Sequence, residues 1–434
     1  MHNCDKYINN TTIGVIVAYI VDYMLREVFG EFFINQSVFL WIIVIYTCVF
    51  LVFNIFKNKK IFSGFDMILI TIIFILIVFS IIGQGMSYFL DNIHIIQNSF
   101  IWFYLLFFFF RCNFYNYKYV KIGILAILFS SLVLTSISML LFISETILQY
   151  SMPFKSWSGL LINGRLSGVF SNPNQLGQIA LLATASSVVL IATEKSGFKK
   201  IIYLICLLLN TIVLFLTDSR SCILAVAIIA MFIIYFYQKR VVIKNRSIKL
   251  FILFIICMLL IFILYKVMGI ERFDLNRFSI DFDDFANKIT SYRWDIWKEV
   301  IYLSKNNLLL GNGFGKLMEN ANLYIGQQSV IYSFKITMAH NAFLDIFYSS
   351  GLVGLIAFII FNVKLFKDGF LICYKPSDIL DVIYSGVMVA LFSISMLDFG
   401  VLYSGLISPM FWIFCGLIIG NAQKKQLSKN EVKS

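Results

Sequence analysis

The sequence predicts an all-α polytopic membrane protein with about twelve transmembrane helices and one long outer loop. Three observations indicate this class. Of the 434 residues, 60% are hydrophobic and only 13% are charged, and the mean hydropathy is +0.87. Apolar stretches near the ~20 residues that cross a bilayer recur from end to end. We therefore expect residues 1–434 to form a single integral membrane domain.

The hydropathy pattern sets the positions of the spans. They are expected at residues 11–28, 36–56, 65–82, 95–110, 120–143, 174–193, 201–217, 221–237, 250–268, 341–366, 379–396 and 403–420. The first apolar segment follows a polar start and has no small-residue cleavage pattern, so we expect it to be retained as a span.

The net charge of +12 comes from short basic loops. If both termini are cytoplasmic, most of the 35 lysines and arginines lie in inner segments or in the long loop that the positive-inside rule does not count. This predicts cytoplasmic termini and gives no reason to expect a nucleic-acid partner. The inner loops are short and the chain has no GxxxxGK[ST] motif, which argues against ATP-driven transport.

The outer side carries the long connection, residues 270–339, and we expect function to face outward. Within it, "TSYRWDIWKEVIYLSKNN" predicts an amphipathic helix. Its apolar face would hold Trp294, Trp297 and Ile301, and its polar face Arg293, Lys298 and Lys305. The helix could lie on the lipid headgroups, its tryptophans could contact a substrate, or both.

The stretch "NGRLSGVFSNPNQLG" places polar residues at the expected start of the sixth span. Asn172 before Pro173 predicts an N-cap and a first helical residue, with Asn174 following. A plain helix cap would explain these residues but not Arg165 just upstream, so we favour a functional loop.

A second polar stretch, "TDSRSCI", opens the eighth span. Arg220 follows a possible serine cap there, with Asp218 beside it. A local Asp–Arg ion pair and a ligand-binding arginine are both consistent with this stretch.

The third stretch is "MAHNAFLDIFYSSGLVG" at the start of the tenth span. His340 and Asn341 begin the span, and Asp345 lies one helical turn beyond Asn341 on the same face. Asn341 and Asp345 could fix the histidine ring or an acceptor, or they could cap and pack the helix. Gly351 and Gly354 would allow close helix packing.

In this topology the sixth, eighth and tenth spans all begin on the outer face. Their helix N-termini would join Arg165, Arg220 and His340 in binding a phosphorylated anion. Histidine titrates near neutral pH, so His340 could accept a proton from an attacking sugar hydroxyl while the arginines neutralise a departing diphosphate. His2 and His94 fit ordinary interfacial positions.

Other motifs carry weaker signals. "LLGNGFG", with Gly311, Gly313 and Gly315, lacks the strand of a dinucleotide site and predicts a tight turn. "DFDD" at residues 281–284 fits a solvated acidic turn. The eight cysteines lie in spans or at inner positions, so we expect no structural disulfide, and their spacing predicts no metal site.

Taken in order, the motifs resemble the O-antigen ligase and Wzy-type polysaccharide polymerase superfamily. The residues that carry the resemblance are "R..G.F.NPN..G", then "SRS" at a span start, then "R..W....", "G.G.G" and "HN.FL......GL.G". They extend from residue 164 to residue 354. The last motif, after a long outer loop, is the most specific.

The resemblance implies a GT-C-like glycosyltransferase that uses polyprenyl-diphosphate-linked glycans at the outer face of the cytoplasmic (inner) membrane. It assigns Arg165, Arg220 and Arg293 to the diphosphate and His340 to the acceptor hydroxyl, with no metal and no cofactor. The expected partners are the polyprenyl-diphosphate-linked oligosaccharide and membrane lipid, with other envelope polysaccharide-assembly proteins left open.

The resemblance does not separate a polymerase, which extends a lipid-linked repeat unit, from a ligase, which transfers to lipid A-core or protein. We favour the polymerase because it needs no second acceptor system. A flippase or secondary transporter is the alternative from another class, and it would keep ionisable residues near the bilayer midplane and often show broken helices or paired halves. In this chain the ionisable residues lie instead at the expected outer ends of the spans.

Overall fold

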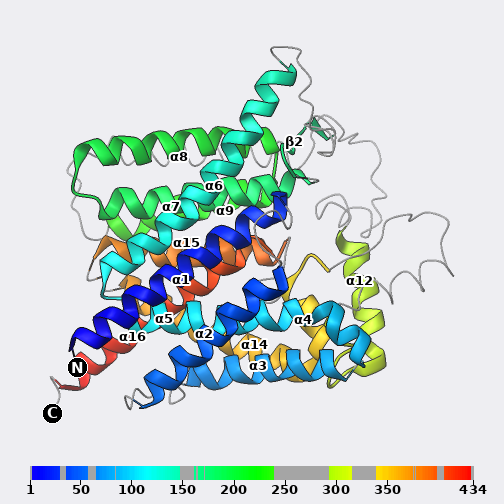
Figure 1. Cartoon of the computed structure of the whole chain (residues 1–434). Coiled ribbons are helices and arrows are strands. Elements are labelled where there is room, and N and C mark those ends of the chain that lie inside the picture. The colour runs from blue at the N-terminus through cyan, green and yellow to red at the C-terminus, as the bar shows by residue number, and fades with distance from the viewer. Residues whose placement is uncertain are drawn as a thin grey trace.

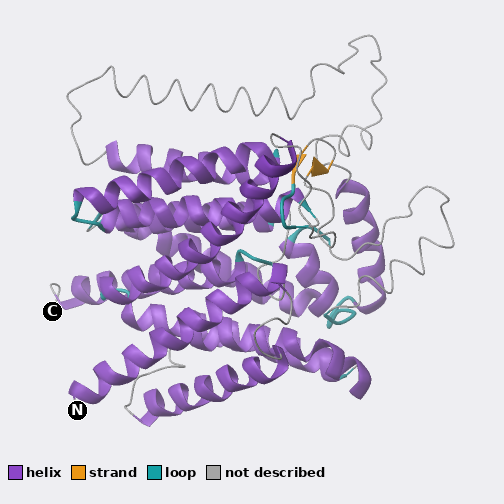
Figure 2. Cartoon of the chain, turned by 45° about the horizontal axis from the view of Figure 1, so that its top comes forward, coloured by secondary structure: helices purple, strands orange, loops and turns teal. Residues whose placement is uncertain are grey.

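The structure is a computed structural model, and it is almost entirely helical (Figure 2). It describes residues 2–29, 36–56, 65–83, 85–146, 161–162, 165–170, 172–238, 293–314, 339–374, 376, 378–397 and 405–431. The expected ninth span, residues 250–268, and the "DFDD" turn lie outside the described residues.

The first half of the described chain contains long helices and one short antiparallel strand pair. These elements are α1 (His2–Phe29), α2 (Gln36–Phe56), α3 (Phe65–Ile82), α4 (Met86–Phe100), the π-helix η1 (Ile101–Phe107), α5 (Phe108–Asn113), α6 (Tyr117–Thr146), β1 (Leu161–Ile162) and β2 (Arg165–Leu166). In the strand pair, Leu161 pairs with Leu166 and Ile162 with Arg165.

The remaining elements are helical. They are α7 (Pro173–Thr193), α8 (Gly197–Thr217), α9 (Arg220–Gln238), α12 (Arg293–Ser304), the 3₁₀ helix η3 (Lys305–Asn307), α14 (Ala342–Tyr374), α15 (Ile379–Ser395) and α16 (Ser408–Glu431).

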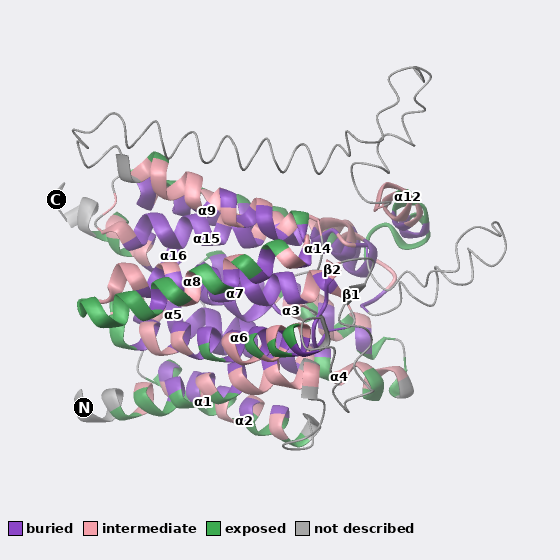
Figure 3. Ribbon diagram, turned by 90° about the horizontal axis from the view of Figure 1, so that it is seen from above, coloured by how far each residue is buried: buried purple, intermediate pink, exposed green. Residues whose placement is uncertain are grey.

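The long helices form a bundle whose two ends differ (Figure 1). Both termini lie at one end, which we call the terminal end. The strands and α12 lie at the opposite end, the loop end, where α12 runs across the bundle instead of along it (Figure 1). Seen from above, α7 is mostly buried, whereas α8 in front of it exposes a row of residues (Figure 3).

Eight of the described helices are long and apolar enough to cross a membrane, and α9 and α15 contain shorter apolar helices. The protein is therefore an all-α, multi-pass membrane protein. Each expected span within the described residues coincides with a helix, while the total of twelve stays a prediction. The expected fourth span is longer than predicted, because α4, η1 and α5 continue as one span over Tyr88–Asn113.

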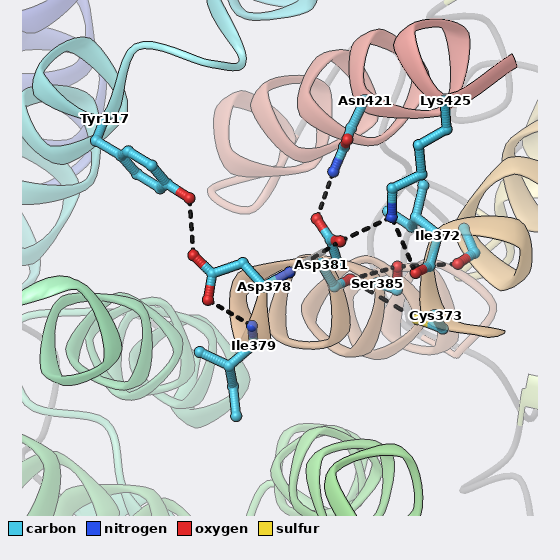
Figure 4. A network of polar contacts seen from close by, with 10 residues as sticks. Tyr117, Ile372, Cys373, Asp378, Ile379, Asp381, Ser385, Asn421 and Lys425 are labelled. Carbon is cyan, nitrogen blue, oxygen red and sulfur yellow. Dashed lines mark hydrogen bonds and ion pairs between the residues drawn. The ribbon is translucent and has the colours of Figure 1, made fainter. Parts of the chain in front are cut away.

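A polar network at the terminal end joins α6, α15 and α16, and Lys425 also donates to Ile372 O of α14 (Figure 4). The Asp381 carboxylate at the start of α15 accepts bonds from Asn421 and, at 2.8 Å, from Lys425 Nζ, both on α16. Tyr117 Oη of α6 donates to Asp378 Oδ2 at 2.8 Å, and Asp378 caps α15. Because Asp381 is almost fully buried, its ion pair holds the ends of α15 and α16 together.

Helix α14 is broken at Gly351, whose φ of 64° and ψ of −162° are not helical. In an unbroken helix the amides of Leu352 and Val353 would donate to the carbonyls of Tyr348 and Ser349. The segment after α12 supplies all four missing partners. Leu352 N and Val353 N donate to the carbonyls of residues 308 and 309 at 2.9 and 3.3 Å, and the amides of residues 312 and 313 donate to Tyr348 O and Ser349 O at 2.7 and 3.0 Å.

Two glycines make this crossing possible. Gly311 has a φ of 77°, and a Cβ there would lie 2.5 Å from Gly351 N. A Cβ on Gly351 would overlap Leu309 O. The expected tight turn at Gly311 and Gly313 is confirmed. Gly351 allows close packing as predicted, but it does so against the loop backbone and by breaking its helix, which the sequence did not predict. A Cβ on Gly354 would overlap Ser350 Oγ of its own helix and would lie at an ordinary contact distance of 3.5 Å from Leu76 Cδ1 of α3.

We expect Gly311→Ala and Gly351→Ala to destabilise the protein. The positive φ alone costs about 1–2 kcal/mol for a residue with a Cβ, and the steric overlap adds to this. Thermal unfolding of the purified protein in detergent measures the effect. Gly197→Ala is the matched control, because a Cβ there meets nothing within 4 Å. Equal melting temperatures for all three variants would contradict the crossing.

Candidate functional site

Arg165 on β2 joins the end of α8 to the start of α7. Its Nε donates to Thr217 O at 2.9 Å, and its Nη2 donates to Asn174 Oδ1 at 2.7 Å. Asn172 caps α7 by accepting from Asn174 N at 2.9 Å, with Pro173 at the first helical position, so the predicted cap is confirmed. The structure thus brings Arg165, Asn172 and Asn174 together.

The turn between α8 and α9 lies against this group. A Cβ on Gly177 of α7 would be only 2.7 Å from Ser219 Cβ, which shows how closely the helix start approaches the turn. Asp218 has a left-handed φ of 47° and ends α8. The predicted serine cap is wrong, because Ser219 Oγ makes no hydrogen bond within the described part of the chain.

Arg220 begins α9 and its side chain is exposed. No ion pair joins it to Asp218, although both residues are described, so the local Asp–Arg pair is wrong. An exposed guanidinium beside a helix N-terminus is free to bind an anion.

His340 lies at the centre of a second group of candidate residues. It occupies a left-handed turn with a φ of 51°. Among the described residues, Asp218 and His340 are the two non-glycine residues with positive φ. Such a conformation is uncommon for residues with a Cβ and persists where neighbouring contacts impose it. Each of these residues lies in a polar stretch that the sequence singled out.

Contacts on both sides of His340 impose its turn. Before it, Ala339 N donates to Asp345 Oδ1 at 2.8 Å, and Ala339 O accepts from Trp297 Nε1 at 2.9 Å. After it, Asn341 Oδ1 accepts from the amides of Phe343 and Leu344 at 3.0 and 3.3 Å, which caps α14. Asp345 is buried. Asn341 and Asp345 therefore hold the turn and cap the helix, which is the second of the two roles that the sequence left open.

The predicted amphipathic helix is confirmed as α12, but its buried face differs from the prediction. Val300 and Leu303 pack with Ala339 and Tyr348, whereas Ile301 is exposed. From the same helix, Trp297 contacts the His340 turn through its bond to Ala339 O. Arg293 lies one helical turn before Trp297 and so shares its face of the helix.

The two groups lie at the same end of the bundle (Figure 1). One contains Arg165, Asn172 and Asn174 with Arg220 at the adjacent start of α9. The other contains His340, Asn341 and Asp345, with Arg293 on the neighbouring helix α12. Each lies at helix N-termini, where the helix dipole favours an anion. Sequence reasoning missed the Trp297–Ala339 bond and the broken helix, although the glycines of "LLGNGFG" and "SSGLVG" were a usable signal for close backbone approach.

Residues 204–359 match the family model of the O-antigen ligases. The resemblance to the O-antigen ligase and Wzy-type superfamily is confirmed. The matched O-antigen ligase segment contains Arg220, Arg293 and His340, and it includes both partners of the broken-helix crossing. Arg165, Asn172 and Asn174 precede it. No curated protein sequence matches the chain at a significant level.

We expect Asp345→Leu to release the turn at His340. The buried Ala339 amide would lose its acceptor, which costs about 1–3 kcal/mol. Hydrogen exchange of a peptide covering Ala339, followed by mass spectrometry, should then show ~10- to 100-fold weaker protection. Asp345→Asn is the control, because its amide oxygen still accepts. If both variants exchange like the parent protein, Asp345 does not hold this turn.

Proposed function

We propose that this O-antigen ligase-type membrane protein is a polysaccharide polymerase. It would transfer a growing glycan from a polyprenyl-diphosphate carrier to a lipid-linked repeat unit at the outer face of the cytoplasmic membrane. The observation that carries the proposal is the His340 turn, which lies in the matched segment, is strained, and is held from both sides.

The proposed step begins at the acceptor hydroxyl. His340 accepts its proton as the hydroxyl oxygen forms a bond to the anomeric carbon of the donor glycan. The bond between that carbon and the diphosphate oxygen breaks, and its electron pair leaves with the polyprenyl diphosphate. Negative charge grows on the departing diphosphate, so cations near it lower the barrier.

The arginines at the loop end are the proposed cations. Arg220 is the principal candidate, because it is exposed at the start of α9 and binds no described carboxylate. Arg165 already holds Thr217 O and Asn174, so it would position this edge of the site as well as contribute charge. Arg293 would face the same space from α12. The proposal needs no metal and no cofactor.

Acceptor identity separates the polymerase from the second candidate, an O-antigen ligase that transfers to lipid A-core or to protein. The family description favours the ligase, whereas the polymerase requires only one lipid-linked species. In either case the glycan carrier and membrane lipid are the proposed partners, with other envelope polysaccharide-assembly proteins as further candidates.

A flippase or transporter is the weaker alternative, even though α14 is a broken helix. In transporters the backbone groups freed by a break line a substrate cavity. Here the loop backbone occupies the groups freed at Tyr348, Ser349, Leu352 and Val353. The break therefore serves to attach the loop that carries α12, and it does not form a transport site.

Reconstitution with one substrate tests the function. Purified protein in proteoliposomes receives the host's polyprenyl-diphosphate-linked repeat unit and EDTA, and products are separated by length. A polymerase produces a ladder of lengthened glycans. Product that forms only when lipid A-core or protein is added would replace the polymerase with the ligase. No transfer to any acceptor would contradict glycosyl transfer altogether.

His340→Ala should lower turnover by about 10²- to 10⁴-fold in this assay, the usual contribution of a general base. Its melting temperature should stay near that of the parent protein, because His340 is partly exposed and Ala339 keeps both of its bonds. His94→Ala, on α4, is the matched control. Turnover close to that of the control would remove His340 as the base.

Arg220 and Arg165 should respond differently to substitution. Losing hydrogen bonds from a charged group costs about 1.5–3 kcal/mol, so Arg220→Ala should lower turnover by ~10- to 100-fold without changing the melting temperature. Arg165→Ala should lower both, because it also removes the bonds to Thr217 O and Asn174. Full activity of Arg220→Ala would contradict its role at the diphosphate.

A further inference from the structure

Three consecutive leucines, Leu308–Leu310, follow η3 and are exposed. Their exposed fractions are 46%, 64% and 68%. Contiguous apolar surface of this kind is unfavourable in water and usually marks a contact with another apolar phase. The sequence places these leucines in the outer loop, where an aqueous environment is the ordinary expectation.

The backbone of this leucine turn lies beside the membrane spans. Val353 N of α14 donates to Leu309 O at 3.3 Å, and Tyr88 Oη, at the start of a candidate span, donates to Phe314 O. Phe314 N lies 3.5 Å from Ser80 Oγ of α3. The leucine turn therefore lies beside α14, and Phe314, four residues further on, contacts α3 and α4 near their ends.

The depth of the turn follows from its neighbours on α3. Gly354, only one residue beyond Val353, lies beside Leu76, because a Cβ on Gly354 would be 3.5 Å from Leu76 Cδ1. Leu76 lies six residues before the last residue of α3, Ile82, which is about 9 Å along the helix axis at 1.5 Å per residue. If α3 crosses the bilayer, the leucine turn lies below the headgroups.

The exposed surface of the leucine turn continues the lipid-facing surface of the bundle. Val353 and Ile356 on α14, and Ile75 and Phe79 on α3, are also exposed. Exposed apolar residues on membrane-spanning helices face lipid. The backbone of the exposed Leu309 is hydrogen-bonded to that of the exposed Val353, so the leucine turn lies next to this surface.

We propose that Leu308–Leu310 form a re-entrant turn that inserts into the acyl region of the bilayer leaflet at the loop end. Irregular backbone is tolerated at membrane depth only where it packs against protein, and the crossing with the broken helix places the carbonyls of residues 308 and 309 against α14, where both are paired. Just before the turn, Lys305 Nζ lies 5.8 Å from the ring centroid of the exposed Tyr302. A lysine and a tyrosine at this point suit the headgroup level.

This insertion would anchor α12 to the membrane beside α14. The anchor lies only a few residues beyond α12, whose Trp297 binds the carbonyl before His340. The proposal does not depend on the reaction that the protein catalyses, so its test is independent of the transferase assay.

Photocrosslinking to lipid tests the insertion. We would place p-benzoyl-phenylalanine at Leu309 of the full-length protein, reconstitute it in phosphatidylethanolamine–phosphatidylglycerol vesicles, irradiate, and measure phospholipid adducts by intact mass. The matched control position is Lys298 on α12, whose side chain is 45% exposed and pairs with Asp295 at 3.0 Å. We expect several-fold more lipid adduct from position 309 than from position 298.

A second probe at Leu310 covers the case in which the first variant does not insert. Leu310 is the most exposed of the three leucines and offers no carbonyl to the crossing. Lipid adducts at 310 support the insertion equally. Adduct yields at both positions no higher than at 298, or crosslinks to the protein's own chain instead of lipid, would overturn the proposal.

Discussion

In a bilayer every backbone amide and carbonyl needs a hydrogen-bond partner. In this structure that constraint acts most strongly at Gly351. Helix α14 stops being helical there, and four groups lose their intrahelical bonds. The backbone after α12 replaces each of them. A side chain or water could satisfy one or two groups, but four in register require another stretch of chain. The long loop is therefore fastened to the membrane bundle by the same constraint that keeps the spans helical.

The attachment of the loop determines how the candidate base is presented. After α12 the chain crosses α14 at residues 308–313. Further along the sequence, Ala339 and His340 lead into the start of α14. Trp297 and Asp345 hold the two polar groups of Ala339, so a residue of the loop and a residue of the span together impose the left-handed turn at His340. A histidine on a free loop would sample many orientations. Here helix packing reduces that freedom before any substrate binds, which is the usual way of positioning a reacting group.

Buried ion pairs at the terminal end contrast with an exposed arginine at the loop end. At the terminal end the buried carboxylates are paired, as in Asp66 with Arg111 at 3.1 Å and Asp381 with Lys425 at 2.8 Å. These pairs join helices and leave no charge for a ligand. At the loop end Arg220 is exposed at a helix start, with no carboxylate partner among the described residues. An exposed arginine at a helix N-terminus favours anion binding there.

The sequence by itself determined the helical membrane class, the boundaries of most described spans, the α7 cap at Asn172 and the presence of α12. All of these follow from local hydropathy, helix periodicity and capping, which act over a few residues. Only the tertiary structure decided that Ile301 faces outward, that Arg220 does not pair with Asp218, that Trp297 holds Ala339, and that Gly351 breaks α14. Each of these depends on contacts between segments distant in sequence, or on the direction of a side chain at a turn. No local pattern carries that information.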